Sequence, residues 1–179
     1  MHIRLALIIA MLLLSGCQHS GIQTAEEISE NGQSQVTNAS EAQLREVAEQ
    51  FFKTYSQRDN FDSFLNHYSD AIVLEDLVYG ERAEGKEAVR GFYRWDSPEV
   101  ELIDQKALTV TEQIISGSNV VTRGVFLPFY YHGQKMGPWR FVIWQEFDDQ
   151  GLIIKQFDWI NYTPKETFIG GENLNGNDD

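Results

Sequence analysis

The chain has 179 residues, of which 27 are Asp or Glu and 14 are Lys or Arg, so its formal net charge is −13. This acidic balance excludes the basic surface that nucleic-acid binding requires. Hydrophobic residues make up 42% of the sequence and aromatic residues 12%, which is typical of one globular domain and excludes collagen-like and low-complexity proteins. With a single cysteine, neither an internal disulfide nor a zinc site made of four cysteines is possible.

The N-terminus has the features of a secretory signal. A short basic region around Arg4 precedes an apolar run over residues 5–14 and the string LSGC, which ends at Cys17. The run is too short to span a hydrocarbon core of about 30 Å as a helix. LSGC resembles the lipobox of bacterial lipoproteins, which implies that residues 1–16 are removed as a signal peptide and that Cys17 becomes the lipidated first residue. An ordinary signal peptide with a cysteine at the cleavage position is the alternative.

The lipobox resemblance also predicts where the protein resides. Gln18 follows the cysteine, whereas an aspartate there would resemble an inner-membrane retention signal. We therefore expect a lipid-anchored protein of the cell envelope, on the outer membrane and facing the periplasm.

Composition divides the remaining chain into a domain and two polar extensions. Residues 17–40 contain no aromatic residue and no Lys or Arg, so they are expected to form a disordered tether. Every aromatic residue lies between Phe51 and Phe168, which places the core in a domain over residues 41–165. Residues 166–179 read as a polar flexible tail.

The first half of this domain has helical periodicity. Residues 40–43 form a capping box, and six apolar residues at helical spacing follow it: Leu44, Val47, Ala48, Phe51, Phe52 and Tyr55. A second, shorter helix is predicted over residues 60–68 and a third over residues 85–95.

Strand patterns dominate the second half. Residues 71–79 predict one strand, and residues 100–115, 119–132, 139–147 and 152–162 predict four more, separated by Gly-containing turns. Helices followed by long antiparallel strands indicate an α+β fold, with three N-terminal helices packed on one side of a strongly curved, mostly antiparallel sheet.

Neither a nucleotide nor a metal ion is expected as a cofactor. The string GERAEGK at residues 80–86 has the spacing of a phosphate-binding loop, but Glu87 stands where a Ser or Thr would hold Mg²⁺. His67 and His132, the only histidines beyond the tether, are too far apart to form a recognisable metal motif.

Several short strings resemble the SnoaL-like branch of the nuclear transport factor 2 superfamily, which also contains ketosteroid isomerase. They are YSDAIVLED at 68–76, GKEAVRGFY at 85–93, and FDDQGLI at 147–153 followed by FDW at 157–159. The resemblance implies a cone-shaped α+β fold that encloses an apolar pocket, often as a homodimer.

The same resemblance assigns two acids. Asp76 falls where ketosteroid isomerase has its proton-transferring base, and Asp158 where SnoaL-type cyclases have their catalytic acid/base. The chain departs from the isomerase elsewhere, because Phe51 or Phe52 falls at its oxyanion-hole tyrosine and Ile143 near its neutral aspartic acid. Steroid isomerisation is therefore not expected.

Strand alternation by itself supports these assignments only in part. It places Asp76 and Glu75 on opposite faces that are both mostly apolar, so periodicity does not choose between them. Asp158 lies between Phe157 and Trp159, where lost solvation would raise the pKa of its carboxyl towards a useful range.

A base that removes a proton next to a carbonyl also needs a partner for the developing negative charge. Candidate ligand-binding donors are Tyr55, Trp144 and Tyr162, with Arg140 as a cationic option. Purely structural roles for these residues stay open, because strand aspartates often cap turns or form ion pairs and aromatic residues often fill cores.

Three functions follow for the domain. It binds a small hydrophobic molecule in the cone, or it is an acid/base enzyme of isomerase or cyclase type that uses Asp76, Asp158 or both, or its open sheet face serves assembly. We favour ligand binding on a membrane-tethered lipoprotein, with enzyme activity as the alternative.

Overall fold

The computed structural model describes residues 26–93, 95, 97–162 and 175, with the side chains of α1 described from Ser40 onward. Three helices lie in this part: α1 (Glu26–Gln57), α2 (Phe61–Leu65) and α3 (Lys86–Tyr93). Nine strands accompany them: β1 (Tyr68–Asp76), β2 (Glu81–Glu84), β3 (Val100–Leu102), β4 (Leu108–Ser116), β5 (Asn119–Phe126), β6 (Phe129–Tyr131), β7 (Gln134–Met136), β8 (Trp139–Phe147) and β9 (Ile153–Ile160). Cys17 lies outside the described residues.

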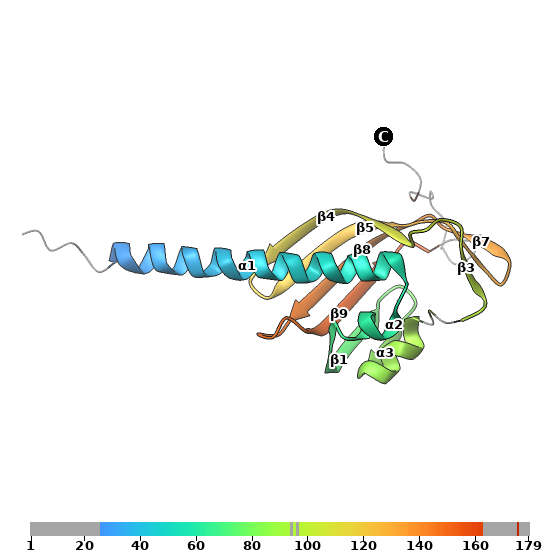
Figure 1. Ribbon diagram of the computed structural model, residues 1–179, viewed down its shortest axis with the longest axis horizontal. Coiled ribbons are helices and arrows are strands. Elements are labelled where there is room, and N and C mark those ends of the chain that lie inside the picture. The colour runs from blue at the N-terminus through green and yellow to red at the C-terminus, as the bar shows by residue number, and fades with distance from the viewer. Residues whose placement is uncertain (1–25, 94, 96, 163–174, 176–179) are drawn as a thin grey trace, which may run out of the picture.

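Helix α1 begins earlier than the sequence predicts. Its backbone is helical from Glu26, within the segment expected to be a tether, so Ser40 lies inside the helix and does not cap it. Low hydrophobicity limits what a segment can bury, but extending an existing helix adds one hydrogen bond per residue and needs no new nucleus. In Figure 1 the N-terminal part of α1 projects beyond the sheet.

The second half of α1 packs onto the sheet as its apolar spacing predicts. Leu44, Ala48, Phe51, Phe52 and Tyr55 are all buried. Phe51 is fully buried, and its ring lies 5.0 Å from that of Phe64 and 5.7 Å from that of Tyr68, centroid to centroid. Burying one such ring stabilises a fold by about 1.5–3 kcal/mol, so this face fixes α1 against the domain.

Six strands form one curved sheet in the order β2-β1-β9-β8-β5-β4 (Figure 1). All neighbouring pairs are antiparallel except β1 and β9, which run parallel. The helices lie over one face of this sheet, and the buried aromatic and aliphatic core fills the space between them. The α+β class with a curved, mostly antiparallel sheet is thus confirmed.

The two longest predicted strands are each interrupted. Residues 100–115 divide into β3 and β4, and residues 119–132 divide into β5 and β6. Pro128 has no N–H to continue the ladder, and the N–H of Ala107 donates to the carbonyl of Ser56 on α1 (2.8 Å) instead of to a strand. Strands β3, β6 and β7 consequently form a separate three-stranded sheet near the C-terminal end of α1.

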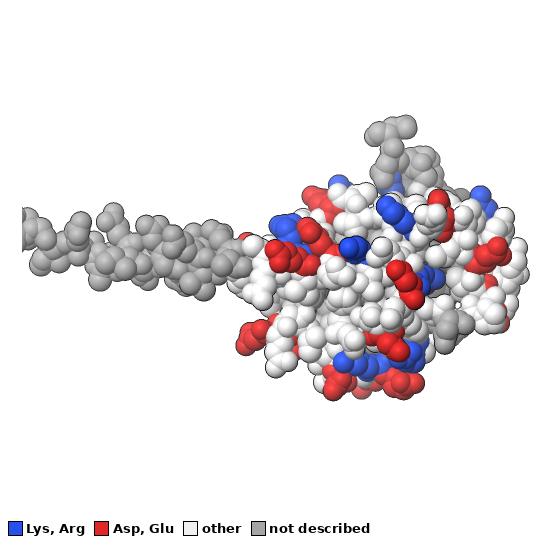
Figure 2. Space-filling view, in the orientation of Figure 1, with Lys and Arg blue, Asp and Glu red and all other residues white. Residues whose placement is uncertain are grey.

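Acidic and basic side chains are interspersed over the face drawn in Figure 2. Five ion pairs bring Arg or Lys residues of different elements onto neighbouring carboxylates, for example Lys155 and Glu146 at 2.9 Å. Within the described residues, no helix is both long enough and apolar enough to cross a membrane.

Candidate active site

A cavity of about 370 Å³ lies where the C-terminal end of α1, helix α3 and the ends of β1 and β9 meet the small sheet. This volume is within the range of about 300–1,000 Å³ that is usual for small-molecule sites. Among the described residues its wall is mostly apolar and aromatic, with four charged residues: Arg58, Asp76, Glu81 and Asp158. The aromatic residues of the wall include Tyr55, Phe92, Tyr93, Phe126, Trp139 and Tyr162.

The two aspartates that the family resemblance singles out are neighbours. Parallel pairing of β1 with β9 places Asp76 directly opposite Asp158, and each residue is only 2% exposed. Both line the cavity. The negative charge of Asp76 therefore acts directly on Asp158 and disfavours the ionised form of the Asp158 carboxyl.

Asp76 is held by three donors. Its Oδ1 accepts the backbone N–H groups of Val78 and Tyr79, both at 2.9 Å, and its Oδ2 accepts the hydroxyl of Tyr162. The two backbone bonds tie the carboxylate to the turn between β1 and β2. Asp76 therefore fixes this turn at the rim of the cavity, and its oxygens have little capacity left to accept a further hydrogen bond.

Asp158 has a different environment. Its Oδ1 accepts Nε2 of Gln156 at 2.9 Å, and its Oδ2 has no hydrogen-bond partner among the described residues. Burial raises the pKa of Asp158 to about 7, the Gln156 hydrogen bond opposes this shift, and the charge of Asp76 adds to it. A carboxyl with that pKa can both accept and return a proton near neutral pH.

A buried network sets the orientation of Gln156. Its Oε1 accepts the Tyr68 hydroxyl and Nε2 of Gln145, both at 3.0 Å, and its Nε2 donates to the Tyr93 hydroxyl at 2.8 Å as well as to Asp158. The two tyrosine hydroxyls lie 2.7 Å apart. Because every polar atom of the Gln156 amide is satisfied, its N–H groups stay directed at Asp158 and Tyr93.

Tyr55 and Arg58 close the α1 side of the cavity. The Tyr55 hydroxyl forms no hydrogen bond with the described residues, and burial raises its pKa, so it remains a neutral donor. The charge of Arg58 lowers the Tyr55 pKa while Asp158 and Asp76 raise it, which places this hydroxyl within electrostatic reach of all three groups.

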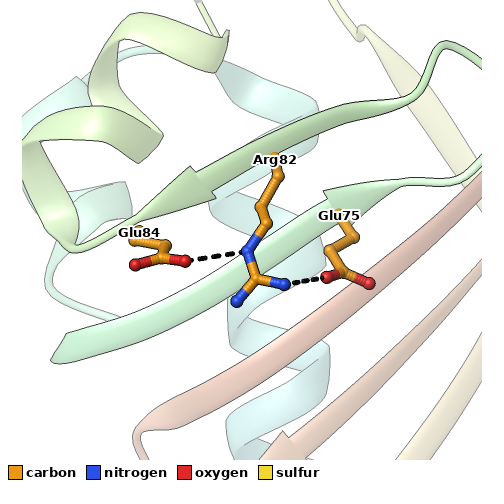
Figure 3. Close-up of polar contacts among 3 residues, drawn as sticks. All are labelled: Glu75, Arg82 and Glu84. Carbon is orange, nitrogen blue, oxygen red and sulfur yellow. Dashed lines mark hydrogen bonds and ion pairs between the residues drawn. The ribbon is translucent and has the colours of Figure 1, made fainter.

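Figure 3 shows why Glu75 is not part of this site. Glu75 lies on β1 next to Asp76 but points to the other face of the sheet, where its Oε1 lies 2.7 Å from Nη1 of Arg82. The Nε of Arg82 pairs in turn with Glu84 at 2.8 Å. The structure thereby chooses between the two acids that strand alternation left equivalent.

The four predicted donors divide into two groups. Tyr55 and Tyr162 line the cavity. Trp144 and Arg140 do not, because they share the opposite face of β8 with Val142; Trp144 is 42% exposed and its Nε1 donates to Asn119 at 2.8 Å. Since β8 alternates, the residue that reaches the cavity is Trp139, one position before Arg140.

Other residues of the site were not among those predicted. Gln156 shares the face of Asp158 by alternation, and this spacing was the available signal for it. Arg58 reads in the sequence as a basic residue at a helix C-terminus, a common arrangement that gives no sign of a cavity. Among the described residues, no group of three or more His, Cys, Asp or Glu could hold a metal ion.

This arrangement, with helices over one face of a curved, mostly antiparallel sheet and buried acids in the wall of a cavity, is that of the nuclear transport factor 2-like class of folds. The model of the SnoaL-like domain matches residues 48–156. The chain belongs to this family. No curated protein matches the sequence.

Solved structures agree with the fold. A protein of Shewanella putrefaciens assigned as a SnoaL-like polyketide cyclase has a TM-score of 0.55 at 16% identity, with 66% of this chain and 89% of that chain covered. An LEH-like epoxide hydrolase of M. tuberculosis has a TM-score of 0.55 at 18% identity, over 68% and 84% of the two chains. A nuclear transport factor 2-like protein of Burkholderia xenovorans has a TM-score of 0.52 at 18% identity, over 74% and 97%. At such identities the likeness extends to the fold alone.

Proposed function

We propose that the domain binds a small hydrophobic molecule in the cavity and transfers a proton on it through Asp158. One observation carries this proposal: an apolar cavity of about 370 Å³ has in its wall a buried carboxyl whose pKa lies near 7. A positioned base of this kind accelerates proton transfer by about 100- to 10,000-fold. Two proteins that share this fold carry names of enzymes, a SnoaL-like polyketide cyclase and an LEH-like epoxide hydrolase, so the fold is compatible with chemistry in its cavity.

The reaction class that suits these groups is proton abstraction next to a carbonyl. Oδ2 of Asp158 takes the proton from carbon, the electron pair of that C–H bond forms the C=C bond of an enolate, and the π pair of the carbonyl moves to its oxygen. The Tyr55 hydroxyl donates a hydrogen bond to this oxygen. Where a C=C bond is conjugated with the enolate, returning the proton to the far carbon of this dienolate isomerises the molecule. Asp76 is a positioning residue in this scheme, because its oxygens hold the β1–β2 turn and Tyr162.

Deuterium exchange tests the proposal. The protein is incubated in D₂O with a panel of ketones from cyclopentanone to decanone, and loss of the α-proton signals is followed by NMR. We expect exchange with at least one ketone, a drop of about 100-fold or more in Asp158→Asn, and no change in Asp149→Asn, a matched substitution in the exposed β8–β9 turn.

The pH profile separates the two aspartates. Exchange by the wild type should rise with pH through about 7 as Asp158 ionises. Asp76→Asn keeps an oxygen that accepts the two backbone N–H groups but removes the charge that raises the Asp158 pKa, so the midpoint should move to lower pH.

Binding without turnover is the alternative function. Panel ketones that bind in the cavity but do not exchange would favour it, whereas equal exchange by the wild type and Asp158→Asn would exclude Asp158 as the base.

The proposal places this domain in the cell envelope as a lipoprotein anchored through Cys17, on the outer membrane and facing the periplasm. Its support is the LSGC string after a short apolar run, together with Gln18. Homodimerisation, which the family resemblance implies, stays a prediction.

A further inference from the structure

Among the described residues, Arg58 is the one cation in the wall of the cavity, and it occupies an unusual place. It follows α1 directly, and its side chain lies over the Trp95 ring with the guanidinium carbon 5.3 Å from the ring centroid. Burial lowers its pKa, which reflects the cost of keeping a cation out of water.

This guanidinium has no ionic partner among the described residues. Its Nε is buried without a hydrogen bond, and no described carboxylate forms an ion pair with it. Five other cations of the described residues do pair with Asp or Glu: Arg82, Lys86, Arg90, Arg123 and Lys155. Arg58 as a whole is half-buried, and a charge that is partly withdrawn from water without a partner is costly, so natural proteins usually provide one.

The backbone adds a second, independent observation. Arg58 has φ = 55°, in the left-handed region where helix C-termini usually have glycine. A residue with a Cβ costs about 1–2 kcal/mol in this conformation. Such strain persists mainly at functional sites, and here it accompanies a side chain that lines the cavity.

We infer that the ligand of this cavity carries a carboxylate, which binds the guanidinium of Arg58, with its apolar part against the aromatic wall. A planar guanidinium matches a carboxylate with two parallel N–H···O bonds. A phosphate dianion fits less well, because the same wall holds Asp76, Glu81 and Asp158 and no second cation among the described residues. The substrate class is then an apolar carboxylic acid, with the reacting carbonyl within reach of Asp158.

This inference rests on the proposed occupancy of the cavity by a ligand, but it does not require proton transfer. Octanoate and octanamide provide the probes, because they have the same apolar chain and differ in charge. Their dissociation constants are measured by isothermal titration calorimetry at about pH 6, where octanoate is ionised and Asp158 is mostly protonated. The location of binding is read from NMR shifts of the cavity aromatic residues.

We expect the wild type to bind octanoate in the cavity about 10- to 100-fold more tightly than octanamide. Arg58→Gln should bring this ratio close to one while octanamide still binds. Arg123→Gln is the matched control, because it removes the same charge from an exposed ion pair on β5, and it should keep the wild-type ratio. Arg58→Lys retains a charge without the planar fork and should give an intermediate ratio; it decides the matter if Arg58→Gln does not fold.

Three results would overturn the inference: a wild-type ratio near one, a ratio that Arg58→Gln leaves unchanged, or no binding of either probe in the cavity. If Arg58→Gln folds and binds both probes equally more weakly, so that their ratio is unchanged, the role of Arg58 is packing against Trp95. Failure of ketone exchange together with a preserved octanoate preference would contradict proton transfer and leave the carboxylate site standing.

Discussion

Asp158 binds its proton more tightly in the folded protein than in the unfolded chain, because burial raises its pKa from 3.8 to about 7. Between these values the folded state holds more protons than the unfolded state. The contribution of Asp158 to the free energy of unfolding is therefore complete below about pH 4 and is lost as pH rises to about 7.

Chemical denaturation at several pH values measures this contribution. Relative to Asp158→Asn, which does not titrate, the wild type should lose up to about 4 kcal/mol between pH 4 and pH 7, at about 1.4 kcal/mol per pKa unit. Asp149→Asn, in an exposed turn, should follow the wild-type curve. Parallel curves for wild type and Asp158→Asn would mean that Asp158 titrates like an exposed carboxyl.

Single residues also show how far the sequence predicts the site. Alternation along β9 correctly places Gln156, Asp158 and Ile160 on one buried face. It could not choose between Glu75 and Asp76, because that choice depends on Arg82 from another strand. The backbone of Arg58 has a positive φ, and in this conformation its side chain reaches the cavity. Hydrophobic periodicity in the sequence does not predict such a conformation.

At the scale of elements, the irregular places in the sheet depend on contacts between strands. The pairing of β4 with β5 shifts register between Val110 and Glu112, next to Gly124 on β5. A Cβ at residue 124 would lie 2.2 Å from the Thr109 carbonyl oxygen and 2.5 Å from Cζ of Phe141. The bulge therefore depends on glycine at this position, although the sequence there reads as an ordinary strand.

Gly124→Ala should consequently destabilise the domain by about 2–3 kcal/mol, because the backbone of β4 must move and the Phe141 ring is packed against Phe52 and Phe126. Thermal and urea unfolding measure the change. Gly91→Ala is the matched control, since a Cβ in that helical position meets nothing within 4 Å. It should stabilise α3 by about 0.5–1 kcal/mol. A Gly124→Ala protein as stable as the wild type would show that β4 can shift freely.

At the scale of the whole molecule, helical and strand periodicity together with the order of elements predicted the α+β class and the curved sheet. The same periodicity missed the separate sheet of β3, β6 and β7, because the breaks near residues 107 and 128 arise from a contact with α1 and from a missing N–H. It also placed the start of α1 too late, since a capping box marks a possible helix end but does not prevent a helix from continuing through it.

Cellular location also belongs to this scale, because the acidic charge of the whole chain bears on it. With a net charge of −13, the protein is repelled by anionic lipid headgroups, so the proposed attachment to a membrane needs an anchor at the N-terminus. Acyl chains contribute about 0.8 kcal/mol per buried CH₂, and stable anchoring takes more than one chain. The lipoprotein type of modification at Cys17 meets this requirement.

Cys17→Ser should therefore move the protein from the membrane fraction to the soluble or unprocessed pool, whereas Ser20→Ala, three residues further on, should leave it membrane-bound. Fractionation of cells that express the full chain measures this distribution. Mass spectrometry of the wild-type N-terminal peptide should find residue 17 at the new N-terminus with acyl groups attached. Identical fractionation of wild type and Cys17→Ser, with no acyl mass on residue 17, would refute the lipoprotein anchor and favour an ordinary signal peptide.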